Sequence, residues 1–209
     1  MAQIATVFIL LTAYFIAHIH SHDLHAKEYL VKKVIDGDTI QLDTGETIRY
    51  IGIDAPELLS KKGGNEFYAR EAARYNRKLV LMKNIRLEFD VVKKDQHGRL
   101  LAYVFVKNVF VNAEIVKHGY ARADIKPPNI KYQDILLAKQ KKAMEEYKGL
   151  WQETKQDTES VYIGNKRIYK LHRPTCPLVK KISDKHKIIF RSRMDAIKIG
   201  FSLCKKCNP

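Results

Sequence analysis

Residues 34–57 read VIDGDTIQLDTGETIRYIGIDAPE, in which two apolar, β-branched runs flank a short polar loop at residues 43–46. The loop contains Gly45, and glycine readily takes the positive φ that tight turns between strands require. The stretch therefore predicts a β-hairpin with strands at residues 40–42 and 48–53. Folding this hairpin brings its two outer ends together.

Acidic residues at both outer ends of the hairpin form a candidate catalytic site. Asp36 and Asp38 precede the first strand, while Asp54 and Glu57 follow the second. The hairpin gathers these carboxylates at one edge with Arg49 nearby, and such a group suits a hard cation. An Asp-Gly-Asp triplet also occurs in ordinary turns, so Asp36 is expected to support the site rather than bind a cation.

The periodicity of the following sequence predicts a small closed β-barrel that carries helices, with the OB-fold as the natural candidate. The expected elements are strands at residues 27–35, 40–42, 48–53, 85–91 and 100–106, and helices at residues 65–83 and 132–150. Asn112 is expected to cap a short helix that ends at Gly119. A polar, aperiodic run at residues 152–160 indicates a linker to a second unit.

The composition indicates a folded protein with a polyanionic partner. The chain has 209 residues, 45% of them hydrophobic, which is enough for one ordinary domain and a small second one. Its formal net charge of +15 favours nucleic acid, with an acidic membrane surface as the weaker alternative.

Residues 1–26 differ from the rest of the chain in composition. An almost unbroken apolar run covers residues 6–19, and no Lys or Arg precedes Lys27. This resembles a secretory signal peptide, with Ala26 as the small residue before a cleavage site. The alternative is an uncleaved membrane anchor through residues 4–19, although the run is short for a membrane span. Both alternatives imply export, and no stable membrane span is expected if the signal is cleaved.

The cysteines all lie in the last quarter of the chain, and three cysteines cannot all pair within one molecule. His172 and Cys176 are separated by three residues, and Cys204 and Cys207 by two. These spacings predict a tetrahedral zinc site with a long intervening segment. The alternatives are a disulfide between Cys204 and Cys207 and an exposed, basic His172.

The strings IDGDTI, IRYIGIDAPE and DQHGRLLAYV occur in this order between residues 27 and 151. Together they resemble the staphylococcal nuclease family. The resemblance implies an OB-fold nuclease that hydrolyses DNA and RNA at the bond to the 5′ oxygen and leaves 3′-phosphates. The segment YARADIKPP at residues 120–128 departs from the family, because it lacks the tyrosines on which the family's type enzyme stacks its nucleotide.

The resemblance also implies roles for individual residues. Asp38 and Asp54 would bind calcium, with the Ala55 carbonyl oxygen as a further ligand. Glu57 would be the general base for the attacking water. Arg49 and Arg99 would hold phosphate oxygens, a task that suits the permanently charged, planar guanidinium group.

The stretch from YIGNKRIYKLHRPTCPLVKK to SRMDAIKIGFSLCKKCNP, within residues 161–209, resembles the zinc-binding N-terminal domain of the Ada DNA-repair proteins. This resemblance implies a small α+β domain with a structural zinc bound by His172, Cys176, Cys204 and Cys207. His172 stands where that family carries its methyl-accepting cysteine, so alkyl transfer is not implied. Ser192 and Gly200 are expected to cap the intervening helix.

Residues 161–209 hold thirteen Lys and Arg against two Asp, so contacts to phosphates are expected of them, with a merely solvated surface as the alternative. The main prediction is an exported, monomeric, calcium-dependent nuclease with a zinc-containing accessory domain. One rival is a nucleic-acid-binding protein on a nuclease fold that has lost catalysis. Another is a surface-anchored interaction protein, which leaves the grouped acids unexplained.

Overall fold

The computed structural model describes residues 27–59, 64–152 and 157–209. The predicted signal peptide or anchor at residues 1–26 lies outside these ranges, as does part of the predicted linker. Within the described ranges, no helix has both the length and the apolar character needed to cross a membrane.

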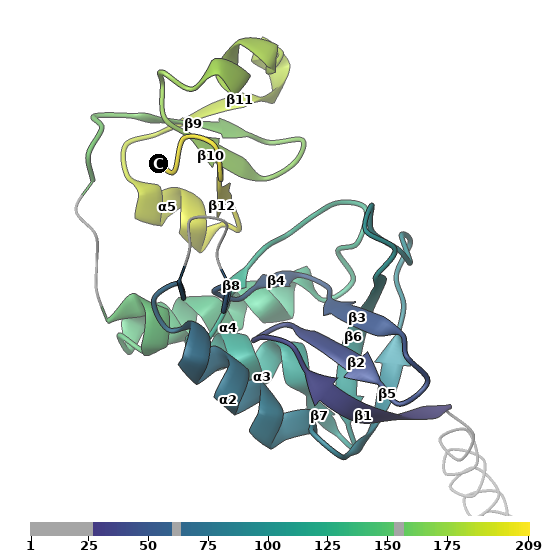
Figure 1. The fold of residues 1–209 in the computed structure, drawn as a ribbon. Coiled ribbons are helices and arrows are strands. Elements are labelled where there is room, and N and C mark those ends of the chain that lie inside the picture. Colours follow the sequence, from purple (N-terminus) through teal and green to yellow (C-terminus); the bar gives the residue numbers. More distant parts are fainter. Residues whose placement is uncertain (1–26, 60–63, 153–156) are drawn as a thin grey trace, which may run out of the picture.

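Five strands close into a barrel (Figure 1), as the sequence predicted. They are β1 (Glu28–Val34), β2 (Thr39–Leu42), β3 (Thr47–Tyr50), β5 (Asn84–Glu88) and β6 (Leu100–Val106). The sheet runs in the order β3-β2-β1-β5-β6, with the short β7 (Val109–Phe110) beyond β6, and a parallel pairing of β3 with β6 closes it. The OB-fold prediction is therefore confirmed.

The predicted hairpin around Gly45 forms. Strands β2 and β3 pair antiparallel, with Thr39 opposite Arg49, and Gly45 in their turn has a φ of 98°. Strands β5 and β6 pair antiparallel in the same way. Alternate residues of these strands point into an apolar core that includes Val31, Ile40 and Ile48.

The helices are shorter than predicted. Helix α2 (Ala69–Val80) begins later than residue 65 because Tyr68 has a left-handed backbone with a φ of 67°. Helix α4 (Gln133–Glu145) ends before residue 150 because Tyr147 has a φ of 50°. A 3₁₀ turn, Gly149–Trp151, follows it. A Cβ on Gly119 would lie 2.2 Å from the Lys148 carbonyl oxygen, so only glycine fits where these two segments cross.

The predicted capping role of Asn112 is wrong. Helix α3 (Val111–Lys117) has Phe110 at its N-cap, and Asn112 lies inside the helix. Its buried side chain accepts a hydrogen bond from the Val104 N–H (3.0 Å) and donates one to the Ile51 carbonyl (2.9 Å). Asn112 therefore fixes the loop between β3 and β4 (Ile53–Asp54), which leads into the predicted site.

The C-terminal part is a four-stranded sheet with one helix, drawn in green to yellow in Figure 1. Its strands run in the order β11 (Lys187–Phe190), β9 (Tyr162–Asn165), β10 (Lys170–His172) and β12 (Ser202–Leu203). As predicted, Ser192 caps α5 (Arg193–Lys198) by accepting a hydrogen bond from the Met194 N–H, and Gly200 follows the helix with a φ of 94°.

The two parts of the chain pack against each other along α4 and α5. Met144 and Trp151 from the first part form one buried cluster with Ile197 from the second. The buried Gln140 side chain donates to the Ile197 carbonyl (2.9 Å) and accepts from the Ala123 N–H (2.8 Å). A satisfied, buried amide of this kind fixes the relative position of the two parts.

Candidate active site and metal centre

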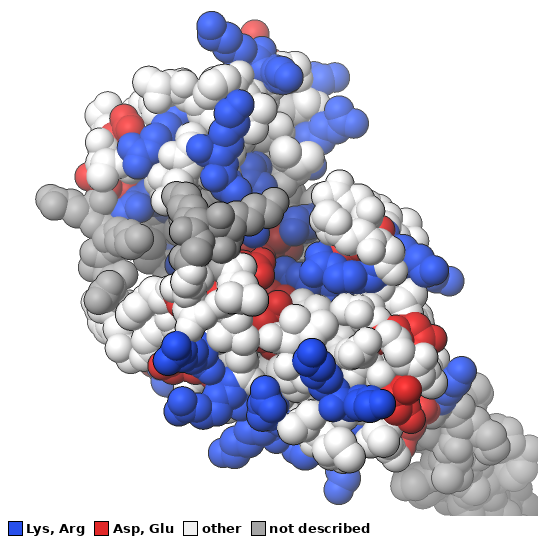
Figure 2. Space-filling view, viewed as in Figure 1, with Lys and Arg blue, Asp and Glu red and all other residues white. Residues whose placement is uncertain are grey.

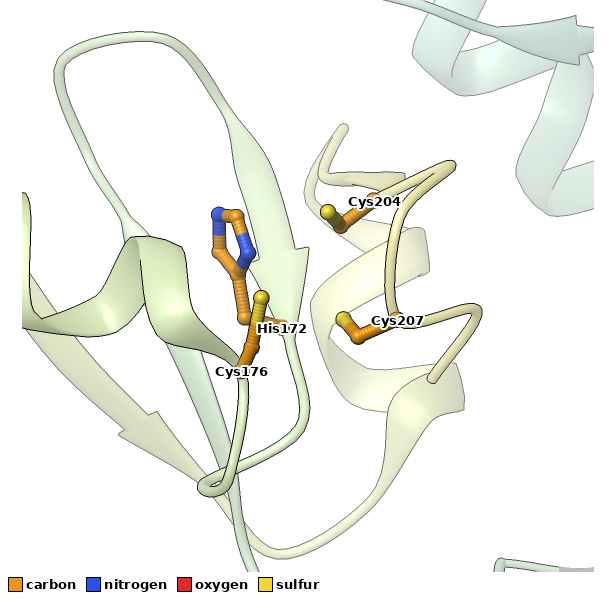
Figure 3. Close-up of side chains that lie close together, drawn as sticks. All are labelled: His172, Cys176, Cys204 and Cys207. Atoms are coloured by element: carbon orange, nitrogen blue, oxygen red, sulfur yellow. The ribbon is translucent and has the colours of Figure 1, made fainter.

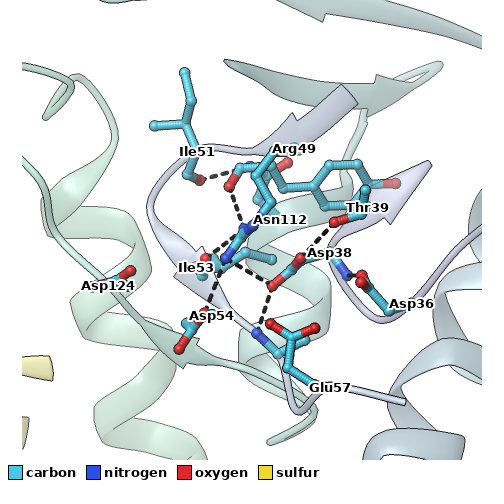
Figure 4. Close-up of polar contacts among 12 residues, drawn as sticks. Asp36, Asp38, Thr39, Arg49, Ile51, Ile53, Asp54, Glu57, Asn112 and Asp124 are labelled. Carbon is cyan, nitrogen blue, oxygen red and sulfur yellow. Dashed lines mark hydrogen bonds and ion pairs between the residues drawn. The ribbon is translucent and has the colours of Figure 1, made fainter. Parts of the chain in front are cut away.

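Arg49 lies at the centre of the predicted catalytic site (Figure 4). Its Nη2 is 3.0 Å from both Asp38 Oδ2 and Asp54 Oδ1. Its Nη1 donates to the Tyr50 carbonyl at 2.9 Å and the Ile53 carbonyl at 2.8 Å. The side chain is only 13% exposed, so these four acceptors hold the guanidinium group in one orientation.

Asp38 is buried at the start of β2, where its Oδ2 also accepts the Ala55 N–H at 2.6 Å. Burial raises the pKa of the Asp38 carboxyl to about 8. Arg49 lowers this pKa, whereas the charges of Asp36 and Asp54 raise it further. Asp36 accepts the Asp38 N–H at 2.9 Å and so supports the turn, as predicted. Carboxylates crowded in this way create a negative potential that a bound cation offsets, so the donor set fits a hard divalent ion.

Glu57 lies beside these acids, at the end of the segment that follows β4 (Figure 4). Its backbone N–H donates to the Glu66 carboxylate at 3.1 Å. Partial burial, followed by the charge of Asp36, raises the pKa of the Glu57 carboxyl, and Lys205 partly opposes that rise. A carboxylate with a raised pKa that remains half-exposed is suited to accept a proton from water.

The Arg99 side chain contacts Asp95. Its Nε and Nη2 are both 2.8 Å from Asp95 Oδ2, and Asp95 Oδ1 accepts the backbone N–H groups of His97 and Arg99. Arg99 immediately precedes β6, whose Leu101 pairs with Arg49. The structure therefore places Arg99 on the adjacent strand but engages its side chain with Asp95.

Arg122 is a site residue that the sequence reading missed. It lies on β8 (Arg122–Ala123), where its backbone pairs with that of Asp54. Its guanidinium lies 5.7 Å from the centre of the Trp151 ring, and burial lowers its pKa. Arg122 belongs to the segment at residues 120–128, and its spacing from the other site residues gives no signal that it lies beside Asp54.

Asp124 is the second missed residue. It is 3% exposed, forms an ion pair with Lys126, and has its Oδ1 3.9 Å from Lys170 Nζ on β10. Burial opposes ionisation, but Lys126 and Lys170 hold the pKa of Asp124 below its usual value. The carboxylate also acts electrostatically on Arg49. Asp124 therefore connects the first part of the chain to the second, close to the candidate site.

The four predicted zinc ligands come together (Figure 3). His172 ends β10, Cys176 follows in the next loop, and Cys204 and Cys207 lie after β12. The side-chain donor atoms lie within 4.8 Å of one another. A tetrahedral zinc with bonds of about 2.0–2.3 Å has ligand atoms roughly 3.5 Å apart, which a small contraction of this group would give.

The chemistry of the four donors also fits zinc. His172 is 2% exposed, and its Nδ1 has no hydrogen-bond partner among the described residues. Burial lowers the pKa of His172, which favours the neutral ring that binds metal. All three thiols are free, and the Arg173 N–H donates to Cys207 Sγ at 3.4 Å. Burial raises the pKa of the Cys207 thiol to about 12, and a bound metal ion would favour its thiolate.

Comparison with known proteins identifies a family match in the first part of the chain. The family model described as staphylococcal nuclease homologue matches residues 47–153. That match includes Arg49, Asp54, Glu57 and Arg99, and it ends before the four cysteine and histidine donors.

Named relatives agree with the family match. The chain is 38% identical over 135 residues to a thermonuclease of Staphylococcus intermedius, covering 63% of this chain and 80% of that protein. It is 37% identical over 126 residues to a thermonuclease of Staphylococcus hyicus, covering 59% of this chain and 75% of the relative. It is 33% identical over 139 residues to endonuclease YncB of Bacillus subtilis strain 168, covering 64% of this chain and 63% of that protein.

Proposed function

The chain belongs to the staphylococcal nuclease family and is a nuclease, and from that premise we propose that it hydrolyses DNA and RNA with calcium and leaves 3′-phosphates. The observation that supports this most is the group formed by Asp38, Arg49, Asp54 and Glu57, in which one buried guanidinium nitrogen contacts two acids. A nucleic-acid-binding protein without catalysis has no need of such a group.

Calcium would be held by Asp38 and Asp54 with the Ala55 carbonyl oxygen, and it would neutralise charge that develops on the scissile phosphate. Glu57 takes the proton from a water as that water's oxygen bonds to phosphorus. The bond from phosphorus to the 5′ oxygen then breaks, the 5′ oxygen takes a proton from water and leaves as a hydroxyl, and the phosphate stays on the 3′ oxygen. Arg49 stabilises the added negative charge from its fixed position beside both acids.

Arg99 has a different place in this proposal. Its ion pair with Asp95 leaves the side chain 34% exposed, and a pair at such a site contributes little to stability. We propose that a substrate phosphate takes the place of Asp95 when nucleic acid binds, because the guanidinium fork matches phosphate geometry.

For residues 161–209, we propose a zinc-binding accessory unit joined to the nuclease unit, residues 27–151, by the linker at residues 152–160. His172, Cys176, Cys204 and Cys207 would hold a structural zinc, and the basic surface would contact phosphates without regard to sequence. The apolar N-terminal run supports export of the enzyme, which we propose to be a monomer.

The decisive experiment is a cleavage assay on labelled DNA and RNA, with calcium present or removed by a chelator, and with analysis of the product ends. The expected result is cleavage only with calcium and products that carry 3′-phosphates. Cleavage that ignores calcium would overturn the metal assignment. Tight binding without cleavage under any condition would favour the non-catalytic alternative.

A further inference from the structure

The accessory unit reaches the catalytic site through Lys205. This residue lies between the candidate zinc ligands Cys204 and Cys207, and its Nζ is 4.0 Å from Glu57 Oε1. The Lys205 side chain is 76% exposed, so its ammonium group is open to a ligand. A cation from a unit outside the family match therefore lies beside the proposed general base.

We propose that Lys205 is a substrate-binding residue of the nuclease, and that its ammonium group contacts a phosphate oxygen next to the scissile bond. The zinc-binding unit then forms one wall of the substrate cleft. This inference rests on the proposed function, and it adds a residue that the nuclease family match does not contain.

The charges around the site explain why a cation is needed there. The carboxylates of Asp36, Asp54 and Glu57 repel a polyanion that approaches the site. Figure 2 shows acidic side chains in a hollow between the two parts of the molecule, with Lys and Arg side chains around it. Lys205 offsets part of this repulsion at the carboxylate that must stay free to accept a proton.

The contact between Lys205 and Glu57 is easily exchanged. Its 4.0 Å separation and the high exposure of both side chains make it a weak ion pair. A phosphate offers Lys205 a stronger, charge-assisted hydrogen bond. Exchange would also release Glu57 for the proton transfer.

The position of Lys205 is built into the fold. Strand β12, which directly precedes Cys204, has Ser202 bonded to Lys170 Nζ at 2.6 Å, and the same Nζ lies 3.9 Å from the buried Asp124. The apolar contact of Leu203 with the cluster of Met144, Trp151 and Ile197 lies beside it. Ser202 and Leu203 of β12 therefore each contact groups that are buried or packed against the first part of the chain. These contacts hold the turn that carries Lys205 beside the nuclease site.

Lys205→Ala, with Lys206→Ala as the matched control, tests the proposal. Lys206 is the exposed neighbour on the same turn, so both changes remove one positive charge. KM and kcat would be measured on a short single-stranded DNA oligonucleotide at saturating calcium. The affinity for the same oligonucleotide would be measured for each change combined with Glu57→Gln, which is expected to slow cleavage enough for binding to be measured.

Lys205→Ala is expected to raise KM and the dissociation constant about fivefold, the effect of one phosphate contact, and to lower the slope of log affinity against log salt by about one. Lys206→Ala is expected to change both constants less than about twofold, and Lys205→Arg to restore binding. In a Cys207→Ser background, where the turn loses one of its proposed zinc ligands, Lys205→Ala should have a smaller effect on both constants.

The results separate this inference from the proposed function. Equal constants and equal salt slopes for Lys205→Ala and Lys206→Ala, in a protein that cleaves normally, would overturn the role of Lys205 and leave the nuclease intact. If the parent protein did not cleave, the proposed function would fail. The binding comparison would then still decide whether Lys205 contacts nucleic acid.

Discussion

The barrel and the C-terminal unit present two different candidate metal sites, and we propose that they use metal for different purposes. The barrel has a large apolar core that runs from Val31 to Leu136, and its acids are positioned by Arg49 and by backbone hydrogen bonds. The C-terminal unit has a small cluster around Tyr162, Leu171 and Phe201, and its four donors face one another. Metal is therefore expected to serve chemistry in the first unit and folding in the second.

The largest expected effect is the response to zinc removal. A zinc-selective chelator, applied with calcium in excess, should unfold residues 161–209, because binding to structural zinc sites of this kind supplies about 10 kcal/mol or more. The barrel should stay folded because its core contains none of the four donors. Hydrogen exchange of the full-length protein, read separately for the two units, measures the difference.

Metal analysis is the control for that result, with one zinc per chain expected. Cys207→Ser should reduce zinc affinity by removing a ligand. A protein that contains no zinc but has a disulfide between Cys204 and Cys207 would contradict the proposal that zinc stabilises the C-terminal unit.

Glu57→Gln should act on chemistry alone. The change keeps the shape of the side chain but removes the base, so turnover should fall roughly a hundredfold or more. The dissociation constant for DNA and the midpoint of thermal unfolding should change little, because Glu57 is half-exposed. Single-turnover kinetics measures the loss, and cleavage at the parental rate would contradict the role of Glu57.

Arg49→Lys and Arg99→Lys sharpen the comparison within the barrel. Both should lower kcat/KM, because lysine cannot reproduce a two-pronged phosphate contact. Only Arg49→Lys should also reduce the free energy of unfolding, by about 2 kcal/mol, because Arg49 is buried and has four acceptors. Arg99→Lys should lower the free energy of unfolding by less than about 0.5 kcal/mol, since the Arg99 side chain is 34% exposed and lysine can still pair with Asp95. If urea unfolding gave equal losses in the free energy of unfolding for the two variants, the greater burial of Arg49 would not make it more important for stability than Arg99.

The sequence predicted what depends on neighbouring residues. The hairpin around Gly45 and the cap at Ser192 follow from local patterns, and the structure has both. The ends of α2 and α4 were missed because Tyr68 and Tyr147 take positive φ, which tyrosine gives no reason to expect. Tertiary packing, not local sequence, imposes those conformations.

Residues distant in sequence explain the remaining errors. Asn112 was read as a helix cap, but its partner Ile51 is 61 residues away. The contact of Lys205 with Glu57 and that of Lys170 with Asp124 join the two units, and no periodicity within either unit predicts them. Side-chain roles at a junction between units require the folded structure.

The smallest expected effect concerns the junction between the two units. Asp124→Asn keeps the shape of the side chain but removes the charge that holds Lys126 and Lys170, and should cost about 1 kcal/mol at pH 7. Lys126 and Lys170 hold the pKa of Asp124 below its usual value despite burial. Its ionised form therefore stabilises the protein above the unfolded pKa of about 4, and that stability is lost as pH falls through the lower, folded pKa.

The difference in the free energy of unfolding between the parent protein and Asp124→Asn should therefore be largest at neutral pH and should shrink in strong acid. Urea unfolding of both proteins across this range measures it. Asp195→Asn is the matched control, because Asp195 is 61% exposed and its contact with Lys198 is long at 3.9 Å. Asp195→Asn should lower the free energy of unfolding by less than about 0.5 kcal/mol at every pH. A difference for Asp124→Asn that did not depend on pH would show that shape, rather than charge, joins the nuclease to its zinc-binding unit.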